Sequence, residues 1–171
     1  MKNRTKIIIG AISLLAVYVI YVALPRPIPN EVLKSSDSNL TGKSAEITVF
    51  DEDVQQISKE LHQILKKVDI YGSIFGLGLA APQIGYKERI IAIKESYGDY
   101  KTMINPEIIE RKWRFPWIEG CFSLEGIHLT QRYFWTKVRY QDLDGNYHEE
   151  LAEKIIQQEI DHLDGILITD Y

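Results

Sequence analysis

The segment from Ile155 to Gly165 most strongly limits what this chain can fold into, because it reads as a helix with polar residues at a fixed spacing. Residues four apart on a helix project from the same face, so Gln158 and His162 point the same way, with Glu159 beside them. The known metal-binding version of this spacing is His-Glu-x-x-His, in which two imidazoles bind the metal and the Glu is the general base. The sequence therefore predicts a metal-site helix in which Gln158 replaces one ligand.

The charge balance limits the partners of the chain. The chain has 171 residues, of which 20 are basic and 24 are acidic. Hydrophobic residues make up 45% of the chain, and this length and composition suit one domain with an appendage. Residues 1–30 hold four of the basic residues and no acidic one, so the remainder is acidic. An acidic body without a basic cluster argues against nucleic acid as a partner. The single cysteine, Cys121, forms no internal disulfide and is either a small buried residue or a ligand or nucleophile.

An uncharged apolar run covers residues 7–24 and follows a basic flank at residues 1–6. Eighteen residues of helix span about 27 Å, roughly the hydrocarbon thickness of a bilayer. A cleaved signal peptide is the alternative, but the run is long for a signal core, and Tyr21 occupies a position that requires a small residue. We therefore expect an uncleaved single-pass membrane anchor.

The charges around the run predict its orientation. Basic residues favour the cytoplasmic side, which places residues 1–6 in the cytoplasm and the body on the extracytoplasmic side. A start later than Met1 would remove the anchor and leave the domain on the cytoplasmic side instead. Residues 25–47, rich in Pro, Ser and Asn, read as a tether and lead-in to a domain that covers residues 48–171.

The domain begins with a helix that Asp51 can cap and whose apolar stripe runs from Val54 to Val68; His62 lies off the stripe and is expected on the solvated surface. A buried strand is expected at Arg89–Ile93, and Met103 begins another extended piece.

Two further elements are expected near the C-terminus. Asp144-Gly145 predicts a hairpin turn between a strand ending at Tyr140 and a short one near Tyr147. The last helix is expected from about Glu150 to Leu163.

Three segments together resemble a known family. They read GLGLAAPQIG at 76–85, EGCFS at 119–123 and QQEIDHLDG at 157–165. Their order and spacing resemble peptide deformylase, the metallohydrolase that removes the formyl group from the N-terminal methionine of new polypeptides. The resemblance runs from about Glu31 to Tyr171. It implies an α+β fold in which small antiparallel β-sheets surround a central helix with the metal-site motif, preceded here by the expected N-terminal transmembrane helix.

The resemblance also implies a metal centre. The family holds a divalent metal, typically Fe(II), through one Cys, two His and a water; Zn and Ni are the alternatives. Carried over, Cys121 and His162 are metal ligands, and Gln158 is a weak or lost third ligand. A thiolate and imidazoles around one open position are typical of catalytic sites.

The remaining roles are carried over in the same way. Glu159 is the general acid/base, while Gln83 and the backbone N–H of Phe122 polarise the formyl oxygen. Fixed donors of this kind are often worth about 3 kcal/mol each. The residues expected to bind the substrate peptide lie in the first two segments: Gly76, Gly78, Leu79, Glu119 and Gly120.

Gln158 leaves the function open between three readings. An amide oxygen is a neutral, weak ligand for metals that prefer imidazole, so we expect deformylase activity on N-formylated nascent polypeptides to be impaired. The alternative is a catalytically inactive, membrane-anchored protein that binds N-formyl or other N-terminal peptides. A scaffold whose motif residues only support the fold is a third reading.

Overall fold

The computed structural model describes the domain and a few residues before it, namely 16–17, 20, 28, 30–69, 76–96 and 98–171. The basic flank at residues 1–6 lies outside the described residues, as does most of the expected anchor at 7–24. Among the residues that are described, no helix is long and apolar enough to cross a membrane. The anchor therefore stays a prediction from the sequence.

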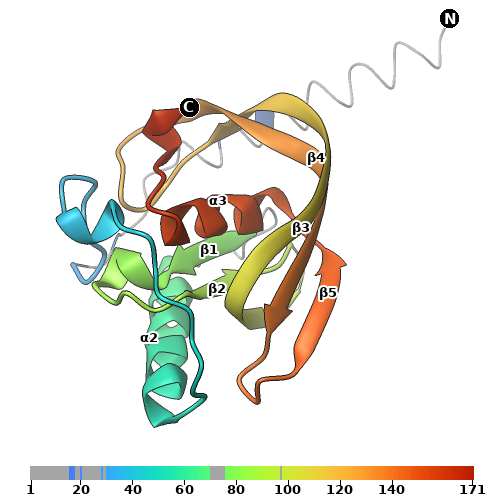
Figure 1. The fold of residues 1–171 in the computed structure, drawn as a ribbon. Helices are drawn as coiled ribbons and strands as arrows, with labels where there is room; N and C mark the ends of the chain where they lie inside the picture. The colour runs from blue at the N-terminus through green and yellow to red at the C-terminus, as the bar shows by residue number, and fades with distance from the viewer. Residues whose placement is uncertain (1–15, 18–19, 21–27, 29, 70–75, 97) are drawn as a thin grey trace, which may run out of the picture.

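The described part combines one antiparallel sheet with helices, which confirms the expected α+β class (Figure 1). The strands follow one another in chain order across the sheet: β1 (Leu77–Ala80), β2 (Ile90–Lys94), β3 (Tyr100–Glu119), β4 (His128–Gln141) and β5 (Tyr147–Leu151). We expected several small sheets, but continuous pairing of each strand with the next makes a single five-stranded sheet. The helices are α2 (Glu52–Val68) and α3 (Lys154–Leu163), with short 3-10 turns η1 (Ser38–Leu40), η2 (Ala81–Ile84) and η3 (Ile168–Asp170).

Helix α2 forms where the sequence predicts it. The Asp51 carboxylate accepts hydrogen bonds from the N–H groups of Asp53 and Val54 at 3.1 and 3.3 Å, so it caps the helix. The apolar stripe is buried and packs with β1 and β2 in one core cluster. This packing supports β1, whose four residues are all buried.

Helix α3 begins at Lys154, so the prediction of Glu150 as its start is wrong. Glu150 and Leu151 belong to β5, where they pair with Val138 and Lys137 of β4. Pairing with the neighbouring strand provides hydrogen-bond partners for the backbone N–H and C=O groups of these residues, so the helix starts later in the chain. The apolar face of α3 packs with β2 and β3, and the long β3–β4 ribbon curves around the helix (Figure 1).

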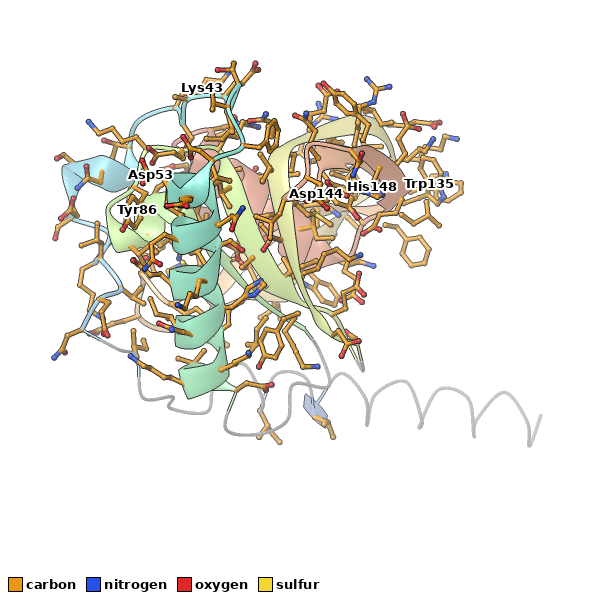
Figure 2. The ribbon with its side chains drawn as sticks, turned by 90° about the horizontal axis from the view of Figure 1, so that it is seen from below. Lys43, Asp53, Tyr86, Trp135, Asp144 and His148 are labelled. Carbon is orange, nitrogen blue, oxygen red and sulfur yellow. The ribbon has the colours of Figure 1, made fainter. Side chains whose placement is uncertain are left out.

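The hairpin predicted at Asp144-Gly145 joins β4 to β5. His148 follows this turn at the molecular surface, where its ring stacks on Tyr140 at 5.3 Å between centroids (Figure 2). Its Nε2 atom lies 2.8 Å from the Asp142 carboxylate.

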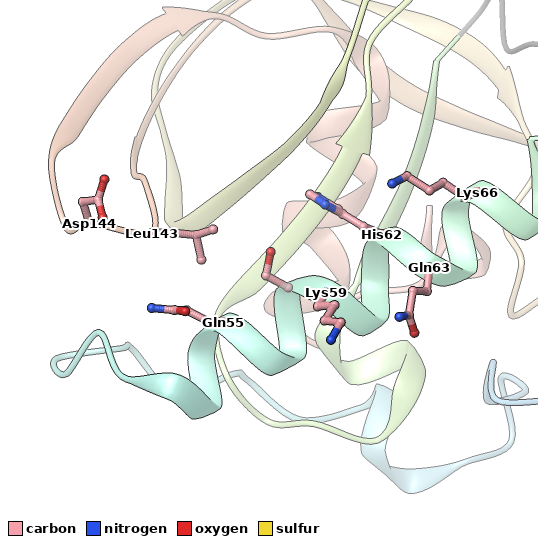
Figure 3. Close-up of a pocket in the computed structure, with 8 residues that line it drawn as sticks. Gln55, Lys59, His62, Gln63, Lys66, Leu143 and Asp144 are labelled. Atoms are coloured by element: carbon pink, nitrogen blue, oxygen red, sulfur yellow. The ribbon is translucent and has the colours of Figure 1, made fainter.

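His62 is half-buried rather than fully solvated. Its Nε2 atom lies 3.1 Å from Thr102 Oγ1, which in turn lies 2.6 Å from Ser58 Oγ. Burial lowers the pKa of His62 below its usual value. The ring lines an open groove between α2 and the β4–β5 turn, together with Gln55, Ser58, Lys59, Gln63, Lys66, Leu143 and Asp144 (Figure 3).

A buried arginine joins three elements. Arg132 of β4 pairs with Glu119 at the end of β3, with a 3.0 Å bond from Nε to the carboxylate, and with Asp161 on α3. Its side chain is only 2% exposed. Beside it, the Tyr133 N–H and C=O each form a 2.9 Å hydrogen bond with the Gln157 amide. These contacts hold α3 against the β3–β4 ribbon.

Replacing Asp51 with Ala should lower the free energy of unfolding by about 1 kcal/mol, because two N–H groups at the start of α2 lose their acceptor. Urea denaturation measures the change. Asp51→Asn keeps a capping oxygen and should stay close to the unmodified protein. Equal losses in the two variants would contradict the capping role.

Replacing Arg132 with Met should lower the free energy of unfolding by about 3–5 kcal/mol, because Glu119 is left as a buried, unpaired carboxylate. Lys137→Met is the matched control on the same strand, since the Lys137–Glu149 pair is 36% exposed on both sides and should cost less than about 1 kcal/mol. Similar losses in the two variants would refute the structural role of Arg132.

Candidate active site

Side chains from three segments that are distant in the sequence meet at one place in the fold. Cys121 follows β3, Gln83 lies in η2, and His162 lies in the last turn of α3. The Cys121 Sγ atom is 3.2 Å from His162 Nε2 and 3.6 Å from Gln83 Nε2. The fold thus brings together three of the residues that the sequence singled out.

The Gln83 amide is held in one orientation. Its Oε1 atom accepts a 2.8 Å hydrogen bond from the Ala80 N–H, which leaves the amide nitrogen to face Cys121 and Ser123. The side chain is buried, so water does not compete for these contacts. A fixed amide donor therefore points at the Cys121 thiol.

The Cys121 thiol sits in a tight turn, where the Ser123 N–H donates to Sγ at 3.4 Å and the Leu124 N–H donates to the Cys121 carbonyl at 3.2 Å. Removal from water, and then the charge of Glu159, raise the pKa of this thiol to about 12. Without a metal the sulfur therefore carries its proton at neutral pH, and metal binding would release that proton.

His162 is almost completely buried. Burial, and then the charge of Arg132, lower the pKa of His162 to about 4, so its imidazole is neutral at pH 7. In the part of the chain that the structure describes, its buried Nδ1 atom has no hydrogen-bond partner. A neutral imidazole is the form in which histidine binds a metal.

Glu159 is buried against the backbone of β1. Burial, and then the charge of Glu119, raise the pKa of Glu159 well above its usual value, which makes this carboxyl group a stronger proton acceptor than an exposed glutamate. A Cβ atom added to Gly78 would lie 2.5 Å from a Glu159 carboxyl oxygen, so only glycine leaves room for this side chain. No described residue hydrogen bonds to Oε2 of Glu159.

Gln158 is buried on the same face of α3 as His162, as its spacing predicts. Its amide nitrogen donates a 3.0 Å hydrogen bond to the carbonyl oxygen of Gly120. The amide of Gln158 therefore fastens α3 to the turn that carries Cys121.

The fit to a metal is partial. Ligands at about 2.3 Å (S) and 2.0 Å (N) on a tetrahedral ion are roughly 3.5 Å apart, close to the 3.2 Å between Cys121 Sγ and His162 Nε2. Within the described ranges, however, no group of three or more His, Cys, Asp or Glu side chains converges on a common point. Cys121 and His162 fit two positions of a metal centre, and Gln158 offers only an amide at the third.

The other two histidines of the final hundred residues point elsewhere. His128 Nε2 lies 3.0 Å from the Glu125 carbonyl oxygen, and His148 bonds to Asp142. Neither joins Cys121 in the described structure.

The residues expected to bind substrate line the same region in different ways. Gly76 precedes β1 with φ +76°, a conformation that favours glycine. The Leu79 side chain is in the core shared with α2, so only its backbone is available to a ligand. The Glu119 carboxylate is paired with Arg132, and the Gly120 carbonyl accepts the bond from Gln158.

Sequence reasoning missed three supporting residues. Ser123 contacts both Gln83 and Cys121, and it lies inside a motif that the sequence analysis quoted. Arg132 and Gln157 hold α3 in place from β4 and from the helix itself. The available signal for Arg132 was its place directly before the aromatic run Tyr133-Phe134-Trp135, which is a weak one.

Known proteins share this architecture. The family model described as polypeptide deformylase matches residues 29–171. The peptide deformylase of Thermomicrobium roseum is 37% identical over 152 residues, covering 81% of this chain and 83% of that protein. A peptide deformylase-like protein of Brucella melitensis is 33% identical over 144 residues, covering 79% and 83%.

A solved structure supports the same relationship. The crystal structure of Thermotoga maritima peptide deformylase matches with a TM-score of 0.70 and 32% identity, covering 81% of this chain and 94% of that one. Together with the matched family model, the arrangement of Gln83, Cys121 and His162 leads to one conclusion. The chain belongs to the polypeptide deformylase family.

Proposed function

We propose that this chain is a peptide deformylase-type hydrolase that removes the N-formyl group from the N-terminal methionine of polypeptides, and that Gln158 reduces its activity. One observation carries the proposal: Cys121 Sγ lies within 3.2 Å of His162 Nε2 and 3.6 Å of the Gln83 amide, beside the buried Glu159. In the proposal these side chains are a pair of metal ligands, a fixed hydrogen-bond donor and a general acid/base.

The substrate would lie along β1. This strand forms one edge of the sheet, and it pairs only with β2. An extended peptide can bind such an edge through its main chain. The backbone at Gly78 lies against the carboxyl group of Glu159, which would place the formyl end of the peptide beside that group.

Two donors would then polarise the formyl oxygen. One is the Gln83 amide nitrogen, held in place by the Ala80 N–H. The other is the Phe122 N–H, which donates to no acceptor among the described residues. Donors fixed before the reaction stabilise the negative charge that develops on this oxygen.

Cys121 and His162 would hold the divalent metal, Fe(II) by family membership, with Zn or Ni as alternatives. When bound, such a metal lowers the pKa of a water molecule so that it becomes nucleophilic near neutral pH. Glu159 would carry the proton from that water to the departing amine as the formyl C–N bond breaks, giving formate and a free N-terminus.

Gln158 weakens this centre in our proposal. Imidazole is the stronger ligand for these metals, and the Gln158 amide nitrogen is committed to the Gly120 carbonyl. Loss of even a supporting partner of a metal ligand commonly costs about 10- to 100-fold in affinity or activity.

Replacing Gln158 with His should raise both the metal bound per chain and kcat/KM for a formyl-Met tripeptide, by about 10-fold or more. The protein is prepared anaerobically with Fe(II) or Ni(II), and metal content is measured beside turnover. Gln158→Asn is the control, since it changes the side chain without supplying an imidazole.

Full metal occupancy and fast turnover by the unmodified chain would show that Gln158 is a competent ligand. Tight binding of the formyl peptide without turnover in any variant would instead favour the peptide-binding alternative.

We also propose that residues 7–24 anchor the chain in a membrane with the domain on the extracytoplasmic side. The support is the uncharged run behind a basic flank. Alkaline phosphatase fused after Tyr171 should be active in bacterial cells, and a green fluorescent protein fused there should be dark. The opposite pair of results would place the domain in the cytoplasm.

A further inference from the structure

The outer part of the β3–β4 ribbon has an unusual composition. We define the outer ribbon as residues 111–118 of β3 and 129–137 of β4. It contains all three tryptophans of the chain and six of its 18 aromatic residues. It also contains five basic residues and no acidic one, in a chain with 24 acidic and 20 basic residues. Arg132 is buried in its ion pairs, so the other four carry the positive charge of the surface. Aromatic and positive side chains are thus concentrated on one ribbon.

The aromatic side chains form a strip that solvent reaches. Trp113 is 69% exposed and Phe134 is 64% exposed, and their ring centroids are 6.4 Å apart. Phe115 continues the strip, with centroids 6.2 Å from Phe134 and 5.6 Å from Trp117. Leu129 is 67% exposed on the same ribbon. Large apolar side chains that cluster at a surface indicate an interaction site.

Cations lie against two other aromatic rings of the ribbon, Trp135 and Tyr133, and against one ring of the strip, Phe134. Lys112 Nζ is 4.4 Å from the Trp135 ring centroid, the Arg111 guanidinium is 4.9 Å from the Tyr133 ring, and Lys154 Nζ of α3 is 5.0 Å from the Phe134 ring. Trp135 lies at the margin of the molecule, on the opposite side from Tyr86 (Figure 2). Glu110 at the border of the ribbon pairs with Lys112, and that pair is about half exposed.

The backbone of the ribbon is strained at its most exposed aromatic residue. Trp113 has φ +58°, in the left-handed region that bulky side chains rarely adopt. Such conformations are energetically costly and cluster at functional sites. The Trp113 ring is not buried in a core that would compensate this cost.

An anionic lipid bilayer matches this chemistry. Trp and Tyr rings concentrate at the boundary between lipid headgroups and hydrocarbon, and nearby Lys and Arg attract anionic headgroups. The outer ribbon combines both in an otherwise acidic protein. A second copy of the chain fits less well, because a symmetric contact through this ribbon would bring Arg111, Lys112 and Arg114 against their own counterparts.

We propose that the outer ribbon is a membrane-binding surface that places Trp113 and Phe134 among the headgroups of an anionic bilayer. Strand β3 continues from this surface to Glu119, and Cys121 follows two residues later. Binding through the ribbon holds the candidate active site close to the bilayer surface. This inference does not depend on the catalytic activity of the site.

The three tryptophans make the proposal directly measurable, since all of them report on the outer ribbon. The full chain is reconstituted with vesicles of phosphatidylcholine alone or mixed with phosphatidylglycerol, with and without brominated lipids. With phosphatidylglycerol, tryptophan emission should shift to the blue and be quenched by brominated lipid. High salt should reduce both effects. Emission that stays unshifted and fully open to iodide in anionic vesicles would overturn the proposal.

Matched variants separate the ribbon from overall charge and from the apolar run at 7–24, which both variants keep. Arg111→Gln, Lys112→Gln and Arg114→Gln together should abolish quenching by brominated lipid. The same charge change on α2, with Lys59→Gln, Lys66→Gln and Lys67→Gln, should leave the quenching intact.

Circular dichroism and thermal melting check that both proteins fold. Equal loss in the two variants would refute a role specific to the ribbon. A blue shift that depends on protein concentration rather than on lipid would refute it too, in favour of self-association.

Discussion

The buried guanidinium of Arg132 is the contact on which the arrangement of this domain most depends. It joins the ends of two strands to the helix that carries His162, through Glu119 and Asp161. A buried charge is tolerated only when it is paired, so each member of this group fixes the positions of the others. The turn after β3 delivers Cys121, and α3 delivers His162; the 3.2 Å between their side-chain atoms follows from this fastening.

Local rules in the sequence predicted much of the fold. The cap at Asp51, the apolar stripe of α2 and the turn at Asp144-Gly145 each depend on a few neighbouring residues, and the structure has all three. The start of α3 and the continuity of the sheet depend on which strand pairs with which. Glu150 reads locally as part of a helix, but its pairing with Val138 makes it part of a strand. Such long-range choices leave little trace in a short window of sequence.

The residues of the candidate site could likewise be predicted from the sequence only in part. His162 was found from its helical spacing to Gln158, and Gln83 and Cys121 through the resemblance, because their motifs are contiguous in sequence. Arg132 was missed because it lies in none of the three motifs and its partners are far away in the chain. Ser123 and Gln157 lie inside the motifs, but their supporting contacts depend on the fold. The bond from Gln158 to Gly120 could not have been foreseen, because it depends on the position of the turn relative to the helix.

The two edges of the sheet differ in a way that bears on how the domain behaves at high concentration. β1 is only four residues long and fully buried, with α3 beside it, while β5 is exposed and carries His148, Glu149 and Glu150 in succession. Short, covered or charged edges resist pairing with the strands of other molecules. Charge therefore protects the β5 edge from aggregation, whereas β1 is too short to pair with more than a short segment. The same asymmetry discourages an incoming strand at β5, whose charges would face it, and favours β1 beside Gly78 as the edge that can accept one.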